Sequence, residues 1–253
     1  MADDLQYMDS NIIDFSLLSS PSPTVAASEL SKLMEYITNW VYFRQGKLCM
    51  HITNIGLSIE FLDKVLDLSK HFFTLPFEEK KKFSRSPDNP RGFAVDGDPE
   101  NPSEACNRLF LLKKRPERWP QAPQEFSLHC ESTTADSGAM TFLLIDREVE
   151  ALEVLKEDQW FKVPIIPHAI VVLVDDQIEI MSNGIVKSVE HRVKPNLEKV
   201  RISTALFHSP NVEKEVGSLK ALVTEGRPPL YKTVKSYINL FDDHFPINDT
   251  MVP

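Results

Sequence analysis

Two side chains that can bind ligands stand ten residues apart in the stretch from residue 159 to residue 209. His191 is a metal-type ligand, because a neutral imidazole nitrogen coordinates transition metals. Arg201 is an anion-type ligand, because its planar guanidinium can bind a carboxylate through two hydrogen bonds, and Ser203 adds a hydroxyl donor. By residue type alone, a His in a sheet is ordinarily packed or hydrogen-bonded, and Arg201 serves equally well as the partner of a neighbouring surface acid. Both alternatives stay open at this level.

Strand-length runs of apolar and β-branched residues must position these side chains. The runs cover residues 160–163, 170–174, 178–181 and 202–207, and they are interrupted by Pro167, Asp175-Asp176 and Asn183-Gly184. This pattern predicts consecutive β-strands joined by tight turns. We therefore expect one antiparallel sheet that brings His191 and Arg201 to the same open end of the sheet.

The N-terminal part of the chain shows helical rather than strand periodicity. After a short predicted strand at 11–18, apolar residues recur at helical spacing in two segments, which predicts helices whose apolar stripes face a core. The first, from about 24 to 40, has its stripe at Leu30, Leu33, Met34, Ile37 and Val41. The second, from 58 to about 74, has its stripe at Phe61, Val65, Leu68 and Phe72 and ends before Pro76.

The string MSNGIVKSVEHRV, followed by RIS, resembles the C-terminal catalytic stretch of the plant 2-oxoglutarate and Fe(II)-dependent dioxygenases. This family includes flavonoid, gibberellin and alkaloid oxygenases. FEEKKKFSRSPDNPRGF and NRLF resemble stretches of its N-terminal half. The resemblance implies an α+β fold with a double-stranded β-helix core, a cupin-like jelly-roll, here incomplete and preceded by N-terminal helices. It places the N-terminal helical region at 1–126 and the truncated jelly-roll core, with a C-terminal helix, at 127–253.

The same resemblance implies the cofactors and the residues that hold them. Asp136 and His191 would ligate Fe(II), while Arg201 and Ser203 would bind the distal carboxylate of the co-substrate 2-oxoglutarate; ascorbate is a further cofactor that the family admits. The family also uses a His two positions before the Asp, where this chain has Thr134. A neutral hydroxyl is a poor iron ligand beside an imidazole. The nearby residues His129, Cys130 and Glu131 are the alternatives that a rearranged loop would present.

A further departure from the family begins after Phe126. Several tens of residues, including a strand with an Asn-x-Tyr-Pro-Pro motif whose Tyr helps to hold 2-oxoglutarate, have no counterpart here, and we infer an internal deletion. Asp175 stands where the family has a turn Gly. We expect this change to be tolerated because Asp adopts left-handed conformations more readily than most residues.

Composition narrows the class of protein. With 253 residues and 42% apolar content the chain can bury one sizeable core, and its formal charge of −9 argues against nucleic acid and anionic membranes as partners. The three cysteines are far apart, and the acidic N-terminus lacks a signal-peptide pattern. We expect a cytoplasmic monomer with a small-molecule substrate. It is either an oxidoreductase of specialised metabolism or, as the alternative, a catalytically inactive truncated relative or non-catalytic small-molecule binding protein.

Overall fold

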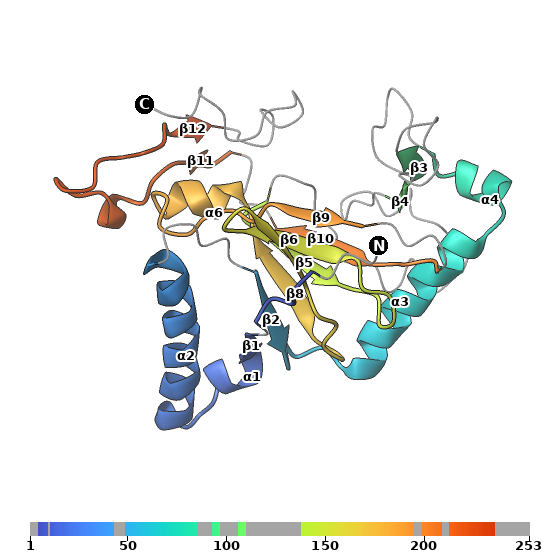
Figure 1. Ribbon diagram of the computed structural model, residues 1–253, viewed down its shortest axis with the longest axis horizontal. Coiled ribbons are helices and arrows are strands. Elements are labelled where there is room, and N and C mark those ends of the chain that lie inside the picture. Colours follow the sequence, from blue (N-terminus) through green and yellow to red (C-terminus); the bar gives the residue numbers. More distant parts are fainter. Residues whose placement is uncertain are drawn as a thin grey trace.

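A five-stranded sheet is the largest element of the protein (Figure 1). The computed structural model describes residues 5–9, 11–42, 49–84, 93–96, 106–109, 138–194, 199–208 and 213–235. The strand order is β1-β2-β8-β5-β10, and every neighbouring pair is antiparallel except β1 with β2. The strands are β1 (Ile12–Asp14), β2 (Cys49–Thr53), β5 (Met140–Leu144), β8 (Ile170–Val174) and β10 (Thr204–His208).

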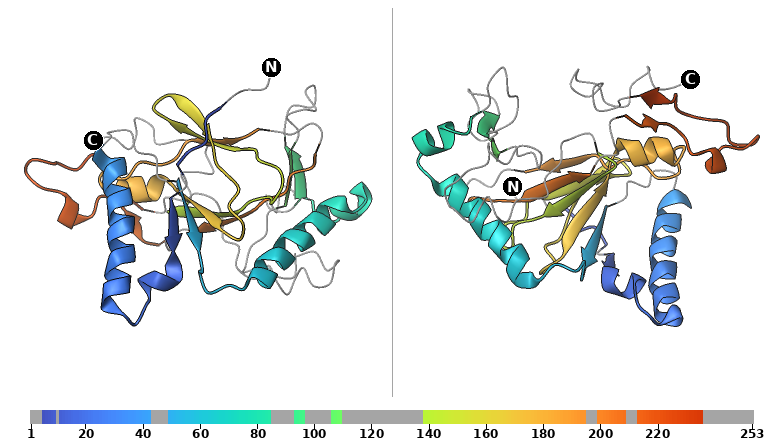
Figure 2. Two further views of the ribbon diagram at one scale, coloured as in Figure 1. Left: turned by 60° about the horizontal axis from the view of Figure 1, so that its bottom comes forward. Right: turned by 180° about the vertical axis from the view of Figure 1, so that it is seen from behind.

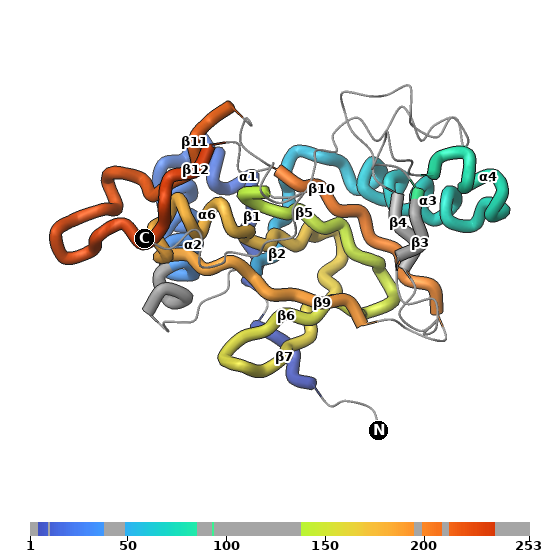
Figure 3. The backbone as a smooth tube through the Cα atoms, turned by 90° about the horizontal axis from the view of Figure 1, so that it is seen from above, coloured from blue at the N-terminus to red at the C-terminus, as the bar shows by residue number. Residues whose placement is uncertain are grey.

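A second, three-stranded sheet lies against one face of the first, as Figure 3 shows from above. It has the order β7-β6-β9 and consists of β6 (Leu152–Lys156), β7 (Gln159–Lys162) and β9 (His191–Val193). We call the apolar side chains between the sheets the inner layer. The larger sheet gives it Cys49, Leu143, Val171 and Leu173, and the smaller sheet and the segments beside it give Leu152, Val154 and Val163. Two facing antiparallel sheets around one apolar layer are the arrangement of a jelly-roll core.

The predicted strand at 170–174 is confirmed as β8, the middle strand of the larger sheet. All five of its residues are buried, because one side of the strand contributes to the inner layer and the other packs against helices. A strand covered on both faces needs no polar alternation, which explains its continuous apolar run.

Helices cover the outer face of the larger sheet (Figure 2). Helix α3 (Ile59–Thr74) begins at Ser58, whose hydroxyl accepts the Phe61 N–H at 3.2 Å, and it ends before Pro76 as predicted. Its buried side includes Val65, Leu68 and Phe72, which confirms most of the expected stripe.

Helix α2 (Pro23–Tyr42) forms where a helix was predicted, but it turns a different side towards the sheet. Leu33 and Ile37 pack against the core together with the buried Tyr36, whereas Leu30 and Met34 are 51% and 52% exposed. Glu29 accepts the backbone N–H of Asp14 at the end of β1, at 2.8 Å, which rotates the Glu29 side of the helix inwards. The prediction for Leu30 and Met34 was therefore wrong.

The run at 178–181, predicted as a strand, belongs to helix α6 (Asp176–Met181). Short apolar runs fit either structure, because a single helical turn and a short strand cannot be separated by periodicity. Asn183 and Gly184 have φ of 54° and 73°, so the predicted turn is present, but it ends a helix instead of joining two strands.

The remaining elements are short. They are α1 (Phe15–Leu18), α4 (Phe77–Lys81), the antiparallel pair β3 (Phe93–Asp96) and β4 (Cys106–Leu109), a 3-10 turn (Lys220–Leu222), and the antiparallel pair β11 (Glu215–Val216) and β12 (Val234–Lys235). The C-terminal helix expected within 127–253 is not among the elements described up to residue 235, and residues 236–253 lie outside the described ranges. Within those ranges, no helix combines the length and apolarity needed to span a membrane.

We predict that stability falls on acidification because of His51, which is fully buried on β2. Burial lowers the pKa of His51, opposed by the Pro164 carbonyl that contacts Nε2 at 3.0 Å. Since the folded-state pKa lies below the unfolded value of about 6.5, this stability is complete above pH 6.5 and is lost as the pH falls towards the folded pKa. Urea unfolding at several pH values between 8 and 5 measures it.

The control is His71→Gln, which changes an exposed histidine on α3. The difference in unfolding free energy between pH 8 and pH 5 should shrink in His51→Gln but persist in His71→Gln. Equal pH dependence in His51→Gln and the wild-type chain would contradict the prediction.

Candidate functional site

The structure places His191 and Arg201 in different sheets. His191 begins β9 of the three-stranded sheet, where it pairs with Val154, whereas Arg201 lies three residues before β10 of the five-stranded sheet. The prediction that one sheet carries both was therefore wrong. The sequence shows two strands near each other in the chain, but the chain crosses from one sheet to the other between them.

Both groups nevertheless belong to the faces that the two sheets turn towards each other. His191 is directly opposite Val154, which is part of the inner layer, and directly paired residues share a face of a sheet. Ser203 directly precedes β10 and stands two residues before Ala205, which packs against the inner layer, so continuing the alternation of the strand by one residue puts Ser203 on the same face. A metal-type ligand and an anion-type ligand thus border the space between the sheets from opposite sides.

The His191 ring is oriented by the backbone. Its Nδ1 lies 3.1 Å from the carbonyl oxygen of Val189, and the Val189 N–H donates to the carbonyl of Val174 at the end of β8. A carbonyl oxygen can only accept, so in the neutral imidazole the proton is on Nδ1 and the lone pair is on Nε2. The imidazole is exposed, so Nε2 is the atom that His191 can offer to a metal.

Arg201 and Ser203 act together. The Nη1 of Arg201 donates to the Ser203 Oγ at 3.3 Å, and both residues are half-buried. The pair presents a fixed positive charge beside a hydroxyl, which is suited to one end of a dicarboxylate.

The described residues supply only part of an iron site. None of them form a group of three or more His, Cys, Asp or Glu side chains able to hold a metal ion. Asp136, Thr134, His129, Cys130 and Glu131 all lie outside the described ranges. Iron therefore has one candidate ligand, His191, among the residues whose positions are described.

The chain is tightly packed just after Asp136, where β5 is about to begin. A Cβ on Gly138 would lie 2.8 Å from both the Asp175 Oδ2 and the His208 carbonyl oxygen, so only glycine fits there. Asp175 itself has φ of −103°, an extended conformation, and its Oδ2 accepts the Thr141 hydroxyl at 2.7 Å. The expected reason for tolerating Asp175, access to left-handed conformations, was therefore wrong, because this position does not require one.

On the outer side of β9, directly after His191, a charged pair is embedded in the sheet. Arg192 Nε donates to the Glu153 Oε2 at 2.6 Å, and the guanidinium lies over the Trp160 ring, 4.0 Å from its centroid. The Glu153 side chain is only 3% exposed, whereas that of Arg192 is 44% exposed. The pair and the ring hold β9 against β6 and β7 from the face opposite His191.

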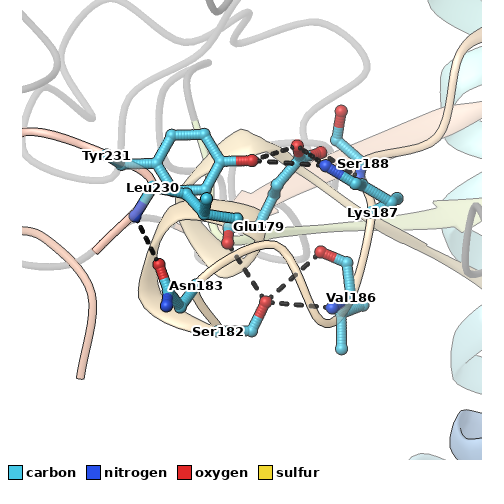
Figure 4. A network of polar contacts seen from close by, with 8 residues as sticks. All are labelled: Glu179, Ser182, Asn183, Val186, Lys187, Ser188, Leu230 and Tyr231. Carbon is cyan, nitrogen blue, oxygen red and sulfur yellow. Dashed lines mark hydrogen bonds and ion pairs between the residues drawn. The ribbon is translucent and has the colours of Figure 1, made fainter. Parts of the chain in front are cut away.

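A second polar network holds the segment that leads into β9 (Figure 4). The buried Glu179 of α6 accepts Lys187 Nζ at 2.8 Å, Tyr231 Oη at 2.6 Å and the backbone N–H of Ser188 at 2.8 Å. Asn183 accepts the Leu230 N–H at 2.8 Å and donates to the Pro228 carbonyl. The network therefore ties residues 213–235 to the loop before His191.

Burial shapes the protonation of this network. It raises the pKa of Tyr231, as does the hydrogen bond to Glu179. Burial alone would lower the pKa of Lys187, but Glu179 outweighs it, so the pKa is raised and the ammonium is retained. Burial and the charge of Glu179 raise the pKa of the neighbouring Asp176, against a hydrogen bond from Ser188.

Sequence reasoning missed these supporting carboxylates. Glu153 gave no usable signal, because nothing in the sequence around it distinguishes an acid that will be buried from one at the surface. A further carboxylate, Asp146 after β5, accepts the backbone N–H groups of Glu148 and Val149. It did give a signal, because an Asp that ends an apolar run and precedes a polar turn is a typical acceptor for the N–H groups that follow it.

Comparison with known proteins identifies related families. Residues 106–210 match the 2OG-Fe(II) oxygenase superfamily, where 2OG is 2-oxoglutarate. Residues 11–127 match the family described as the non-haem dioxygenase in morphine synthesis N-terminal region. The two matches together run from residue 11 to residue 210.

Individual relatives are plant oxygenases. Codeine O-demethylase from Papaver somniferum is 28% identical over 288 aligned residues, covering 87% of this chain and 77% of the relative. Flavonol synthase 1 from Crocosmia x crocosmiiflora is 52% identical over 100 residues, 40% of this chain and 30% of the relative. The alignment with codeine O-demethylase has several tens more positions than there are residues of this chain in it. At those positions this chain has gaps opposite residues of the relative.

Solved structures share the fold. JOX2 in complex with 2OG, Fe and JA has a TM-score of 0.74 at 23% identity, over 95% of this chain and 87% of that one. The dioxygenase for auxin oxidation in rice has a TM-score of 0.68 at 18% identity, over 92% and 94%. These similarities confirm the jelly-roll fold that the sequence predicted.

We predict that Arg192→Met destabilises the protein by roughly 3 kcal/mol, because it leaves the buried Glu153 carboxylate without its cation. Urea unfolding measures the effect. The double variant Arg192→Met/Glu153→Leu is the control, since removing both charges should recover most of the loss. A double variant as unstable as Arg192→Met alone would show that contact with Trp160, rather than the charge pair, holds this face.

Proposed function

The chain belongs to the 2OG-Fe(II) oxygenase superfamily, and from this premise we propose that it binds 2-oxoglutarate through Arg201 and Ser203 with little or no oxidative turnover of its own. The observation that carries the proposal is the Arg201–Ser203 pair on the inner face of the larger sheet, across from the sheet that bears His191. The superfamily and the plant relatives support a role in specialised small-molecule metabolism.

Binding of 2-oxoglutarate depends on the distal carboxylate. A guanidinium can form two parallel hydrogen bonds with that carboxylate, and the adjacent hydroxyl adds a third donor. The bond between Arg201 and Ser203 limits the conformations of both side chains before a ligand arrives, which lowers the entropy lost on binding.

The donor set is incomplete for iron. Fe(II) together with 2-oxoglutarate supplies the oxidising chemistry in this superfamily. Here the sequence offers Asp136 and His191, with Thr134 at the position of the other imidazole. Two ligands in place of three hold a metal ion weakly.

The internal deletion after Phe126 is part of the proposal, supported by the gaps in the alignment with codeine O-demethylase. With it we propose the division of the chain into residues 1–126 and 127–253, and a cytoplasmic monomer that takes a small-molecule ligand. The second candidate, an active oxidoreductase, is favoured by the names of the relatives and requires a substitute ligand from His129 or Glu131.

The first prediction from this proposal concerns binding. Arg201→Ala should weaken 2-oxoglutarate binding by at least about tenfold, because hydrogen bonds to a charged group contribute ~1.5–3 kcal/mol. Arg201→Lys should recover part of it, since an ammonium keeps the charge but loses the planar pair of donors. Calorimetric titration without oxygen, with and without Fe(II), gives the affinities. Arg227→Ala, which removes an exposed arginine, is the matched control, and an equal loss there would refute the site.

The second prediction concerns turnover. The wild-type chain should release no appreciable succinate from 2-oxoglutarate in air, and Thr134→His should restore Fe(II) affinity more than activity. The imidazole repairs the ligand set, but the Tyr that would hold 2-oxoglutarate is still missing, and the loss of such supporting contacts typically costs ~10- to 100-fold. Anaerobic Fe(II) titration, followed by the visible absorption of the 2-oxoglutarate chelate, and then succinate assay measure both.

Thr224→His is the control for this variant, because it adds an imidazole at an exposed turn. Its metal affinity should remain that of the wild-type chain. Substantial succinate release by the wild-type chain would overturn the proposal of weak turnover and direct attention to His129 and Glu131 as substitute ligands.

A further inference from the structure

The backbone between Arg201 and Ser203 is held by a carboxylate from another part of the chain. Asp146 follows the end of β5, and its Oδ2 accepts the N–H of Ile202 at 3.1 Å. Its Oδ1 accepts the N–H groups of Glu148 at 2.9 Å and Val149 at 3.0 Å. One side chain therefore shapes the turn after β5 and fixes the segment that enters β10.

The Asp146 carboxylate is suited to this position. Burial alone would raise the pKa of Asp146, but the three backbone N–H donors and the nearby Lys70 outweigh it and hold the pKa below its usual value. The group is therefore ionised at neutral pH, and hydrogen bonds to a charged acceptor are shorter and stronger than neutral ones.

A second contact fixes the same segment from the helical side. The Ser69 hydroxyl of α3 donates to the Val65 carbonyl at 2.8 Å, so at 3.1 Å it accepts the hydroxyl of Thr204. Thr204 also pairs with Leu144 at the end of β5. With Thr204 held on one side and the Ile202 N–H on the other, the peptide planes that carry Arg201 and Ser203 have little freedom to rotate.

We propose that Asp146 is a positioning residue for 2-oxoglutarate, because it fixes the Ile202 peptide and thereby aims the Arg201 guanidinium and the Ser203 hydroxyl at one carboxylate. This inference rests on the proposed function. Asp146 does not touch the ligand. It acts through the backbone of the two residues that do.

The two oxygens of Asp146 allow a specific test. In Asp146→Asn the side chain keeps one acceptor oxygen, which satisfies two turn N–H groups if it faces Glu148 and Val149 but only one if it faces Ile202. The amide NH₂ group should therefore face the Ile202 N–H, and two donors repel. The variant preserves the turn and selectively breaks the contact with the β10 segment, whereas an alanine would remove both.

The experiment is calorimetric titration of the full chain with 2-oxoglutarate, together with hydrogen exchange of the backbone amides at 201–204. We expect Asp146→Asn to bind at least about tenfold more weakly and to exchange faster at these amides, since a hydrogen bond to a charged acceptor changes an equilibrium by that much or more.

The matched control is Asp14→Asn, at the opposite edge of the same sheet. Asp14 also accepts a backbone N–H, from Ser16 at 3.0 Å, and a side-chain amide, from Asn54 at 2.8 Å. It should lose stability without losing affinity or protection at 201–204. An equal loss of affinity in Asp14→Asn would reduce the role of Asp146 to general stability and overturn the inference.

The outcomes separate this inference from the proposed function. Suppose that the wild-type chain binds 2-oxoglutarate and that Arg201→Ala weakens this binding. Unchanged binding in Asp146→Asn would then overturn the inference and leave the proposed function standing. A wild-type chain that does not bind 2-oxoglutarate would overturn both. Unchanged exchange at 201–204 would refute the anchoring in either case.

Discussion

The inner layer between the two sheets is the contact on which the candidate site depends. Cys49, Val171 and Leu173 are fully buried there, and Leu152 and Val154 meet them from the smaller sheet. Burying an aliphatic side chain of this size stabilises the fold by roughly 1.5–3 kcal/mol, so a handful of them is comparable with the whole stability of a domain. Because Val154 lies opposite His191, and Ala205 two residues beyond Ser203, the same layer fixes the two sides of the site.

Apolar packing sets which faces meet, but it does not set the direction of individual polar groups. That is done by carboxylates that accept backbone N–H groups, the buried Glu179 and the half-buried Asp146. Glu179 accepts from Ser188, three residues before His191, and Asp146 accepts from Ile202, between Arg201 and Ser203. Each candidate ligand-binding segment is thus held by an acid from a different element. Such acceptors are costly to bury unless they are satisfied, which favours one defined arrangement of the loops.

The parts of the fold that the sequence predicted are those with local signals. The run at 170–174 and the capped helix at 59–74 carry their pattern within a few residues, and both were predicted correctly. The run at 178–181 was too short to distinguish a turn of helix from a strand. The separation of His191 and Arg201 into two sheets is a property of topology, which adjacent strands in the sequence do not reveal. Likewise, Asp146 meets Ile202 across 56 positions and Tyr231 meets Glu179 across 52, so the partners of these acids cannot be read from local pattern.

The place of β2 in the larger sheet has a consequence for how the chain reaches its native state. His51 on β2 pairs with Val171 on β8, more than a hundred positions later, and β1 attaches to the sheet only through β2. The native pairing of β2 with β8 therefore cannot form until β8 has emerged during synthesis. Pairings between distant segments close slowly because the entropy of a long loop is lost before any contact is gained. Until then Cys49, Met50 and Ile52 of β2 lack the partner strand beside which they are buried in the native sheet, and such unpaired apolar segments are prone to aggregate.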